Sequence, residues 1–283
     1  MQQKPLVLVP TDFSTIADNA LEHAINYAKK LNSTILLLHV KHPMIIPPTD
    51  LPIPVKEEIM DSYLEKIPKR LDELKQKVES FGVECEIAKE FGLLLDEIKI
   101  YCETRKPALI VTGTQKNHHL AKKILGSNSI DMAKELKSPV LIVPEDYKYK
   151  KPEKILYATE YNEFDINHID YLKSWCDSET AMYVAHVNTD TAEYYVKEEQ
   201  KNWFEELLES KTGQQTFFFS TIHNEDVADG ILSYINKLNF DMLCMSTERK
   251  NFWQNIFQKS HTQDIASKID IPLLIFDNTW SLS

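Results

Sequence analysis

The sequence predicts an α/β protein made of two tandem domains, each a five-stranded parallel sheet flanked by helices. The chain has 283 residues, which suits two domains of about 140 residues each. An internal repeat supports this division, because a shift of 133 residues places the run 109–114 on the run 242–247. Short, continuous apolar runs also alternate with segments of helical periodicity, which is typical of buried parallel strands joined by helices.

The repeat extends along both halves of the chain with small changes in spacing. The same shift of 133 places Ser127 on Ser260. Near the start of each copy the shift becomes 148, which places Thr11 on Thr159, and in the second predicted strand it becomes 147. Such differences indicate loops of unequal length. The longer first-copy loop is predicted at 41–54, where five prolines favour irregular surface structure.

In the first copy the apolar runs predict strands near 5–10, 34–40, 83–88, 108–112 and 140–143. Between the first two, apolar residues recur at helical spacing from Ala17 to Leu31 and describe one buried face. A second helix is predicted at about 55–80, with a kink or break at Pro68. A further helix is predicted at 130–136, before the last strand.

In the second copy strands are predicted near 154–159, 181–187, 215–219, 241–245 and 272–276. The segment 147–153 is rich in lysine and contains a proline, so it is predicted to be a linker. The resulting domains are 1–146 and 154–283.

Composition restricts the class of protein. The net charge is −11, and it divides unevenly, with 20 basic and 21 acidic residues in 1–148 against 12 and 22 in 149–283. An acidic chain without a basic stripe does not favour nucleic-acid binding. No apolar run has the length to span a bilayer, and the first residues lack a signal-peptide pattern. Four separated cysteines indicate reduced, mostly structural thiols. We therefore expect a cytoplasmic protein with no membrane segment and no zinc ribbon.

The most informative run begins at Gly113 and ends at Gly126, followed directly by Ser127. It joins a predicted strand to a predicted helix, where glycine lets the backbone approach an anion and the helix offers unpaired N–H groups. Neither the P-loop spacing nor the dinucleotide Gly-x-Gly-x-x-Gly pattern is present. Two other interpretations are that the glycines serve only the turns and that Ser127 only caps the helix.

This spacing resembles the universal stress protein family, whose nucleotide-binding members carry Gly, two residues, Gly, nine residues, and then Gly-Ser or Gly-Thr. Here Gly113 and the pair Gly126-Ser127 match, whereas Lys116 occupies the middle glycine position. Three further runs resemble the family's first strand with its terminal acidic residue, its second strand and its last strand: 6–14, 36–40 and 138–144.

The resemblance implies Rossmann-like domains of the adenine nucleotide alpha hydrolase type and a role in stress-linked nucleotide binding. The ligand would be ATP or a related adenine nucleotide, with or without Mg²⁺. Asp12 would accept a hydrogen bond from a ribose hydroxyl, although it is equally suited to capping the first helix, alone or with Ser14. The implied nucleotide-binding residues are Pro10, Thr11, Asp12, Val40, Thr112, Gly113, Lys116, Gly126, Ser127, Asn128 and Ser129. No catalytic residue stands out.

Two alternatives stay open from the sequence. If Lys116 closes the pocket, the chain is a nucleotide-free protein-interaction module of the same fold; if bound ATP is cleaved, it is a slow ATPase. The second copy has lost the pattern, since Ser246 and Lys259 replace its two glycines. We therefore expect one nucleotide per chain, in the first domain.

The last strands of the two copies, 140–143 and 273–276, are predicted to pair with each other and form an intramolecular pseudo-dimer, because apolar strand edges otherwise invite association. Any higher oligomer is left open. His39 and His186 occupy equivalent strand ends, and their repetition indicates packed, hydrogen-bonded histidines instead of catalytic bases.

Overall fold

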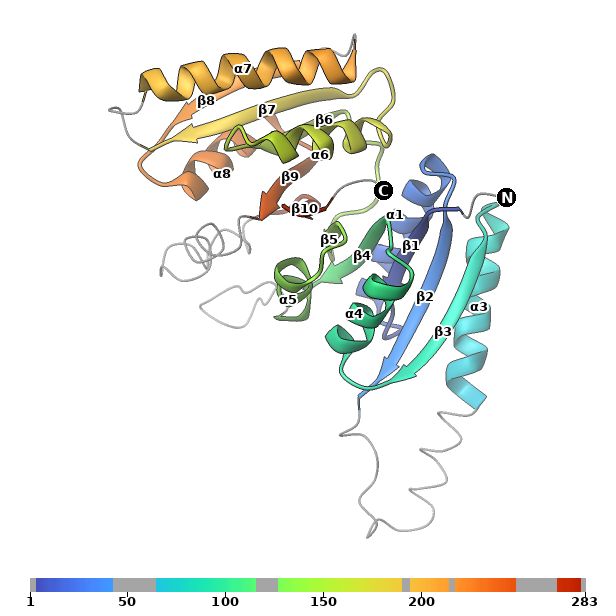
Figure 1. Cartoon of the computed structure of the whole chain (residues 1–283). Coiled ribbons are helices and arrows are strands. Elements are labelled where there is room, and N and C mark those ends of the chain that lie inside the picture. Colours follow the sequence, from blue (N-terminus) through green and yellow to red (C-terminus); the bar gives the residue numbers. More distant parts are fainter. Residues whose placement is uncertain are drawn as a thin grey trace. The chain divides into compact units, whose positions relative to one another are not determined.

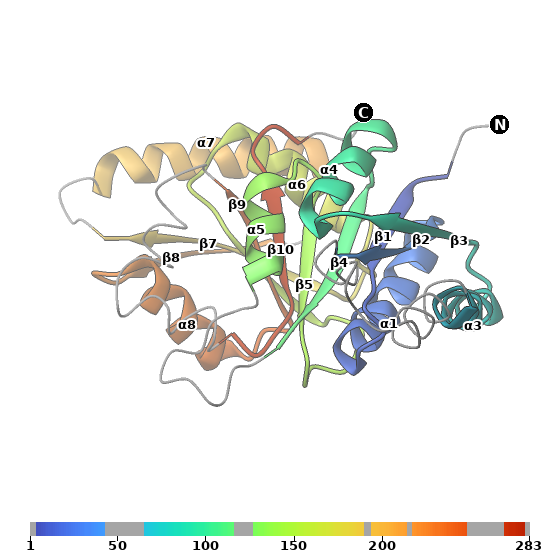
Figure 2. The same ribbon diagram turned by 90° about the horizontal axis from the view of Figure 1, so that it is seen from below.

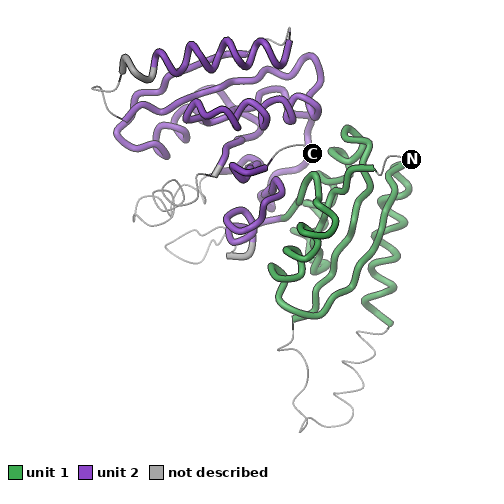
Figure 3. Tube along the Cα trace, viewed as in Figure 1, with its two compact units in different colours: residues 1–112 green, residues 113–283 purple. Residues whose placement is uncertain are grey.

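The computed structural model describes residues 4–42, 65–115, 127–189, 194–213, 217–247 and 269–280. It divides into two compact units, 1–112 and 113–283, and each is considered by itself (Figure 3). The boundary falls inside strand β4 (Leu109–Thr114), so the last two residues of this strand belong to the second unit.

The first unit is built on parallel strands in the order β3-β2-β1-β4 (Figure 1). Besides β4 these are β1 (Leu6–Pro10), β2 (Thr34–Lys41) and β3 (Cys85–Phe91). Every residue of β1 is buried, as is expected of a central strand covered on both faces. In the β1–β2 register Pro10 lies beside Leu38, so both strands end at the same edge of the sheet.

Helices cover both faces of these strands. Figure 2 shows α1 (Thr15–Lys30) and α3 (Ile67–Ser80) on one side of β1–β3 and α4 (Leu94–Thr104) on the other. The apolar face predicted from Ala17 onward is buried in α1, and its neighbour α3 begins at Ile67 with Pro68 in its first turn. N–H groups in the first turn of a helix have no intrahelical acceptor. A proline is therefore tolerated there, because its missing N–H costs the helix no hydrogen bond. The earlier part of the predicted helix and most of the loop 41–54 lie outside the described residues.

The second unit contains six strands in the order β5-β10-β9-β6-β7-β8. Five of them run parallel, and β5 joins through an antiparallel pairing with β10 in which Leu141 lies opposite Leu274. The predicted pairing between the last strands of the two copies is therefore confirmed. The bounds are β5 (Val140–Pro144), β6 (Lys154–Ala158), β7 (Ala181–Asn188), β8 (Phe217–His223), β9 (Met242–Thr247) and β10 (Leu273–Asp277).

The helices of this unit repeat the arrangement of the first. In Figure 2, α6 (Glu163–Lys173) and α7 (Tyr194–Thr212) lie on one face of β6–β8, and α8 (Val227–Leu238) lies on the other. The short α5 (Ser127–Glu135) packs on β5 and β10. The order of strands β8-β7-β6-β9 in the second copy matches β3-β2-β1-β4 in the first. The predicted α/β fold with tandem copies is thus confirmed.

Two strands run further along the chain than predicted, and β3 also begins later. The strand expected at 83–88 is β3, and the one expected at 215–219 is β8. Both strands lie at the outer end of their unit's strand order, and several of their side chains are exposed. An apolar run therefore marks only part of each, because an outer strand does not bury both faces along its whole length.

The segment 147–153, predicted to be a linker, is fixed to the second unit by Asp241. The Oδ2 atom of this aspartate accepts hydrogen bonds from the N–H groups of Glu153 at 2.8 Å and Lys154 at 2.9 Å. Its Oδ1 atom pairs with Lys150 Nζ at 2.5 Å, and its backbone carbonyl accepts from the Tyr147 hydroxyl at 3.1 Å. The segment is therefore held along its length, and the proposed domain limits of 1–146 and 154–283 stay a prediction.

The four cysteines are free thiols, as expected. Burial raises the pKa of the Cys85 thiol to about 12 and holds that of Cys244 well above its ordinary value. A thiol with a raised pKa is a poor nucleophile at neutral pH. In the described part of the chain, no helix combines the length and apolar character required to cross a membrane.

Candidate functional site

Five predicted site residues lie at the carboxyl edge of the strands of the first unit. Pro10 ends β1 and is followed by Thr11 and Asp12, while Val40 lies near the end of β2 and Thr112 in β4. Strand β1 stands between β2 and β4, so the chain leaves it in one direction and returns on its other side. Open α/β sheets bind ligands beyond the carboxyl ends of strands at such a reversal.

The turn after β1 is held by its own hydrogen bonds. The Thr11 N–H donates to the carbonyl of Leu38 in β2 at 2.9 Å, and the Thr11 hydroxyl accepts from the Phe13 N–H at 3.0 Å. His39 Nδ1 lies 2.8 Å from the Thr11 carbonyl oxygen, and the rings of His39 and Phe13 are 4.7 Å apart. Phe13 adopts a φ of 64°, which is uncommon for a residue with a side chain. Asp12 is therefore placed in a tight and well-defined turn.

Asp12 is exposed, and Ser14, not Asp12, caps helix α1. The Ser14 hydroxyl accepts from the Ala17 N–H at 3.2 Å, the usual N-cap arrangement. Asp12 Oδ1 accepts from the Ser14 N–H at 2.9 Å, which fixes the orientation of the carboxylate. Within the described part of the chain the second carboxylate oxygen has no partner. The turn thus presents one oriented, accessible acceptor.

The remaining predicted residues belong to the second unit. Gly113 lies in β4, and its carbonyl accepts a hydrogen bond of 3.0 Å from the hydroxyl of Ser129, whose side chain is buried. The Ser129 hydroxyl proton is therefore directed to the backbone, and only the N–H of this residue is suited to an anion. Ser127 and Asn128 begin α5. Lys116 and Gly126 lie outside the described residues, as do His118 and His119, so the phosphate half of the site stays a prediction.

The second copy repeats the turn after its first strand. The Tyr161 N–H donates to the Thr159 hydroxyl at 2.8 Å, and His186 Nδ1 lies 3.0 Å from the Thr159 carbonyl oxygen. Tyr161 also has a positive φ, of 59°, and its ring lies 5.1 Å from that of His186. Both histidines are therefore hydrogen-bonded parts of the architecture, as predicted.

Behind this second turn lies a buried polar network that sequence reasoning missed. Asp165, which is fully buried, accepts from the Tyr157 hydroxyl and the Thr159 hydroxyl, each at 2.7 Å. His168 Nδ1 lies 3.0 Å from the Tyr157 hydroxyl oxygen, and the histidine ring stacks on Phe276 at 4.4 Å. The single hydroxyl proton of Tyr157 is donated to Asp165. The Tyr157 oxygen therefore accepts from His168, whose Nδ1 atom carries the proton of this second hydrogen bond. Burial and then the Asp165 charge hold the pKa of Tyr157 well above its usual range.

Comparing the two copies residue by residue would have revealed the network. A shift of 148 places Tyr157 on Val9 and Asp165 on Ala17, both apolar and buried in the first copy. The same shift places His168 on Ala20. Three coordinated changes from apolar to polar at buried positions indicate a network, since an isolated buried polar group is costly.

The described residues contain no group of three or more histidine, cysteine, aspartate or glutamate side chains suited to a metal ion. In the first unit the candidate site therefore consists of the turn at Asp12 and the strand ends beside it, and the part predicted after β4 stays a prediction.

Comparison with known proteins gives a consistent result. The model of the universal stress protein family matches residues 6–144 and 176–277. The chain is 31% identical over 149 residues to universal stress protein MJ0531 of Methanocaldococcus jannaschii, an alignment that covers 52% of this chain and 83% of the relative. It is 28% identical over 143 residues to universal stress protein YxiE of Bacillus subtilis, covering 48% of this chain and 97% of that protein.

Among solved structures, a universal stress protein from Archaeoglobus fulgidus superposes with a TM-score of 0.70, at 18% identity and with 97% of each chain covered. This likeness extends over both copies and supports the tandem fold. From the family match over both copies, together with the tandem fold, the chain belongs to the universal stress protein family.

Proposed function

We propose that this protein binds one adenine nucleotide, ATP or a close relative, through its first copy. The observation that carries the proposal is the Asp12 carboxylate, which is exposed, oriented by the Ser14 N–H and placed at the reversal point of the strand order. A ribose offers hydroxyl donors, and an ionised carboxylate accepts from them with strong, charge-assisted hydrogen bonds.

The residues around Asp12 fit a nucleoside better than a free phosphate. The carboxylate would repel a phosphate group, whereas the half-buried Val40 offers apolar surface for a base near the end of β2. The phosphates would go to the run that follows β4, where Gly113 and Gly126 reduce steric hindrance. Helix α5 begins at Ser127, and its first N–H groups lack intrahelical acceptors. Lys116 would supply a cation to the phosphates.

The second copy is a poor host for the same ligand. The Thr159 hydroxyl, equivalent to that of Thr11, donates to Asp165 and also accepts from Tyr161. Ser246 replaces the first glycine of the pattern, and its side chain reaches the Tyr157 hydroxyl. The polar groups of this copy thus bond to one another. This supports a stoichiometry of one nucleotide per chain.

Titration calorimetry with ATP, in the presence and absence of Mg²⁺, tests the proposal. We expect one site per chain and weaker binding by Asp12→Ala, since a hydrogen bond to a charged group contributes about 1.5–3 kcal/mol. The matched control is Glu160→Ala, which removes the equivalent acidic residue of the second copy and should leave affinity unchanged. Gly126→Val should block the approach of the phosphates, whereas Ser260→Ala should have little effect.

Two sites per chain, or equal losses in Asp12→Ala and Glu160→Ala, would contradict the assignment. Absence of binding by the parent protein would favour the nucleotide-free interaction module. Product analysis of the same ATP mixtures separates binding from slow hydrolysis.

A further inference from the structure

Arg70, on helix α3, lies against the turn that carries Asp12. Its guanidinium carbon is 4.4 Å from the centre of the Phe13 ring, and its NH2 group donates to the Phe13 carbonyl at 3.1 Å. Fifty-seven residues separate the two in sequence, so the contact depends on the packing of α3. Arg70 therefore holds Phe13 both by its ring and by its backbone.

The contact continues through the turn to the strand beside it. The Phe13 ring also lies 4.7 Å from the ring of His39, and His39 is hydrogen-bonded to the Thr11 carbonyl. Asp12 stands between Thr11 and Phe13, so the residues on either side of the carboxylate are both restrained. In the described part of the chain Arg70 has no acidic partner, and its exposed charge is directed to the turn alone.

The contacts from Arg70 oppose relaxation of the Phe13 backbone. A residue with a side chain in the left-handed region is strained relative to ordinary backbone, and Phe13 has a φ of 64°. Without an external restraint the turn would gain by relaxing Phe13, and this would rotate the adjacent Asp12 carboxylate away from its present direction. The hydrogen bond and the cation–π contact from Arg70 act against this relaxation.

The second copy stabilises its turn differently. Tyr161, the counterpart of Phe13, has its ring 5.6 Å from that of Phe204 on α7, and Phe204 is fully buried. There the turn is held by apolar packing, and no arginine is found among its described contacts. A surface cation that bonds to the turn is thus a property of the copy in which Asp12 is exposed.

We propose that Arg70 is a positioning residue for nucleotide binding. It fixes Phe13 and, through it, the direction in which Asp12 presents its carboxylate to the ribose hydroxyls. This inference rests on the proposed function, and it adds a residue from outside the strand-end loops to the site.

The test compares ATP with 2′,3′-dideoxy-ATP, which lacks both ribose hydroxyls. Because Arg70 acts through Asp12, Arg70→Ala should lower ATP affinity by up to about tenfold, the value of one hydrogen bond of about 1.4 kcal/mol. Affinity for the dideoxynucleotide should not change. Arg70→Ala should also have no further effect in an Asp12→Ala background, since contacting residues are not additive. Arg70→Lys, which retains the charge, should be intermediate.

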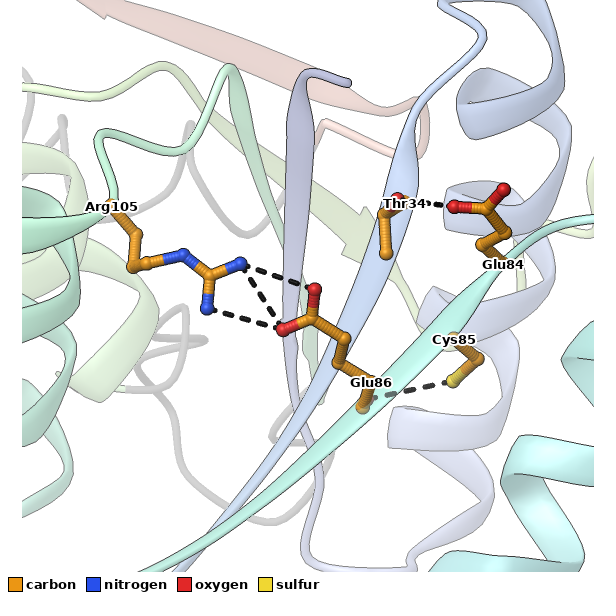
Figure 4. A network of polar contacts seen from close by, with 5 residues as sticks. All are labelled: Thr34, Glu84, Cys85, Glu86 and Arg105. Carbon is orange, nitrogen blue, oxygen red and sulfur yellow. Dashed lines mark hydrogen bonds and ion pairs between the residues drawn. The ribbon is translucent and has the colours of Figure 1, made fainter. Parts of the chain in front are cut away.

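The matched control is Arg105→Ala. Arg105 is an arginine of the same unit that forms a two-pronged ion pair with Glu86 at 3.1–3.2 Å, shown in Figure 4. Arg105→Ala should change neither the affinity for ATP nor the affinity for the dideoxynucleotide. Circular dichroism should show that each variant keeps its fold.

The outcomes are distinguishable. If the parent binds ATP and Arg70→Ala weakens both nucleotides equally, Arg70 contacts the phosphates or base directly and positioning is wrong. If neither affinity changes, Arg70 has no role. If the parent binds neither nucleotide, the proposed function fails and this inference fails with it.

Discussion

Replacing Asp241 should destabilise the second copy more than replacing any of the other residues that hold the segment 147–153. Asp241 is only 6% exposed, and it accepts from the N–H groups of Glu153 and Lys154. Asp241→Ala leaves both N–H groups without this acceptor. Since each hydrogen bond to a charged group is worth about 1.5–3 kcal/mol, we expect a loss of about 3–5 kcal/mol in the free energy of unfolding. Asp241→Asn retains one acceptor oxygen and should lose about 1–2 kcal/mol.

Tryptophan fluorescence during urea unfolding measures this effect selectively. All four tryptophans of the chain lie in the second copy, at Trp175, Trp203, Trp253 and Trp280. The control is Lys150→Ala, which removes the exposed partner in the ion pair with Asp241 and should cost less than about 1 kcal/mol. Equal losses for Asp241→Ala and Lys150→Ala would show that the backbone hydrogen bonds do not carry the stability.

The same contacts predict a dependence on pH. Burial raises the pKa of Asp241, but hydrogen bonds from Lys150 and from the N–H groups of Lys154 and Glu153 outweigh it, so the net change is a lowered pKa. The stabilisation is fully present above the unfolded-state pKa of about 3.9 and is lost as the pH falls through the lower folded-state value. The stability difference between parent and Asp241→Asn should therefore be constant between about pH 5 and 7 and shrink below about pH 4. A difference that grows on acidification would refute the reasoning.

Three further predictions concern the second copy and use the same fluorescence measurement. Tyr157→Phe removes a donor to Asp165 and an acceptor for His168, so stability should fall by about 1–3 kcal/mol; an unchanged midpoint would mean that the network relaxes without loss. Asp226→Ala removes the N-cap of α8, which accepts from two backbone N–H groups, and should cost about 0.5–2 kcal/mol. Asn239 ends α8 with a φ of 54°, so Asn239→Val should cost about 1–2 kcal/mol while Asn239→Gly should cost nothing measurable, and equal effects of the two would exclude backbone strain as the cause.

The fold followed from local features of the sequence. Buried strands such as β1 and β10 are continuous apolar runs, and the repeat supplied their order twice. Strands β3 and β8 extend beyond their predicted ends, because each is the outer strand of its unit and carries exposed side chains. A continuous apolar run indicates a strand that is buried on both faces. It does not predict the bounds of a strand when one face or one edge is open to solvent.

The residues of the candidate site stay a prediction, and the contacts that hold its turn could not be predicted from the sequence. The turn at Asp12 follows from its position after β1, whereas the contact between Arg70 and Phe13 joins segments whose separation gives no local signal. The same is true of Asp241, whose partners lie 87 and 88 residues away. Hydrogen bonds between polar groups far apart in the sequence leave no periodic pattern, so only the folded chain reveals them.

The antiparallel pairing of β5 with β10 also has a consequence for how the two copies can change. When two identical chains form a dimer through the same strand edge, both edges have the same sequence. Every substitution is then present twice in the dimer. Here the paired edges are unlike, with Leu141 opposite Leu274 in a single molecule, and the covalent connection keeps them together at any protein concentration. A change in one copy therefore enters the assembly once. One copy can therefore contain the buried Tyr157–Asp165–His168 network while the other keeps an exposed turn at Asp12. Because the two unlike copies belong to one chain, pairs of two like copies do not compete with the pair of unlike copies.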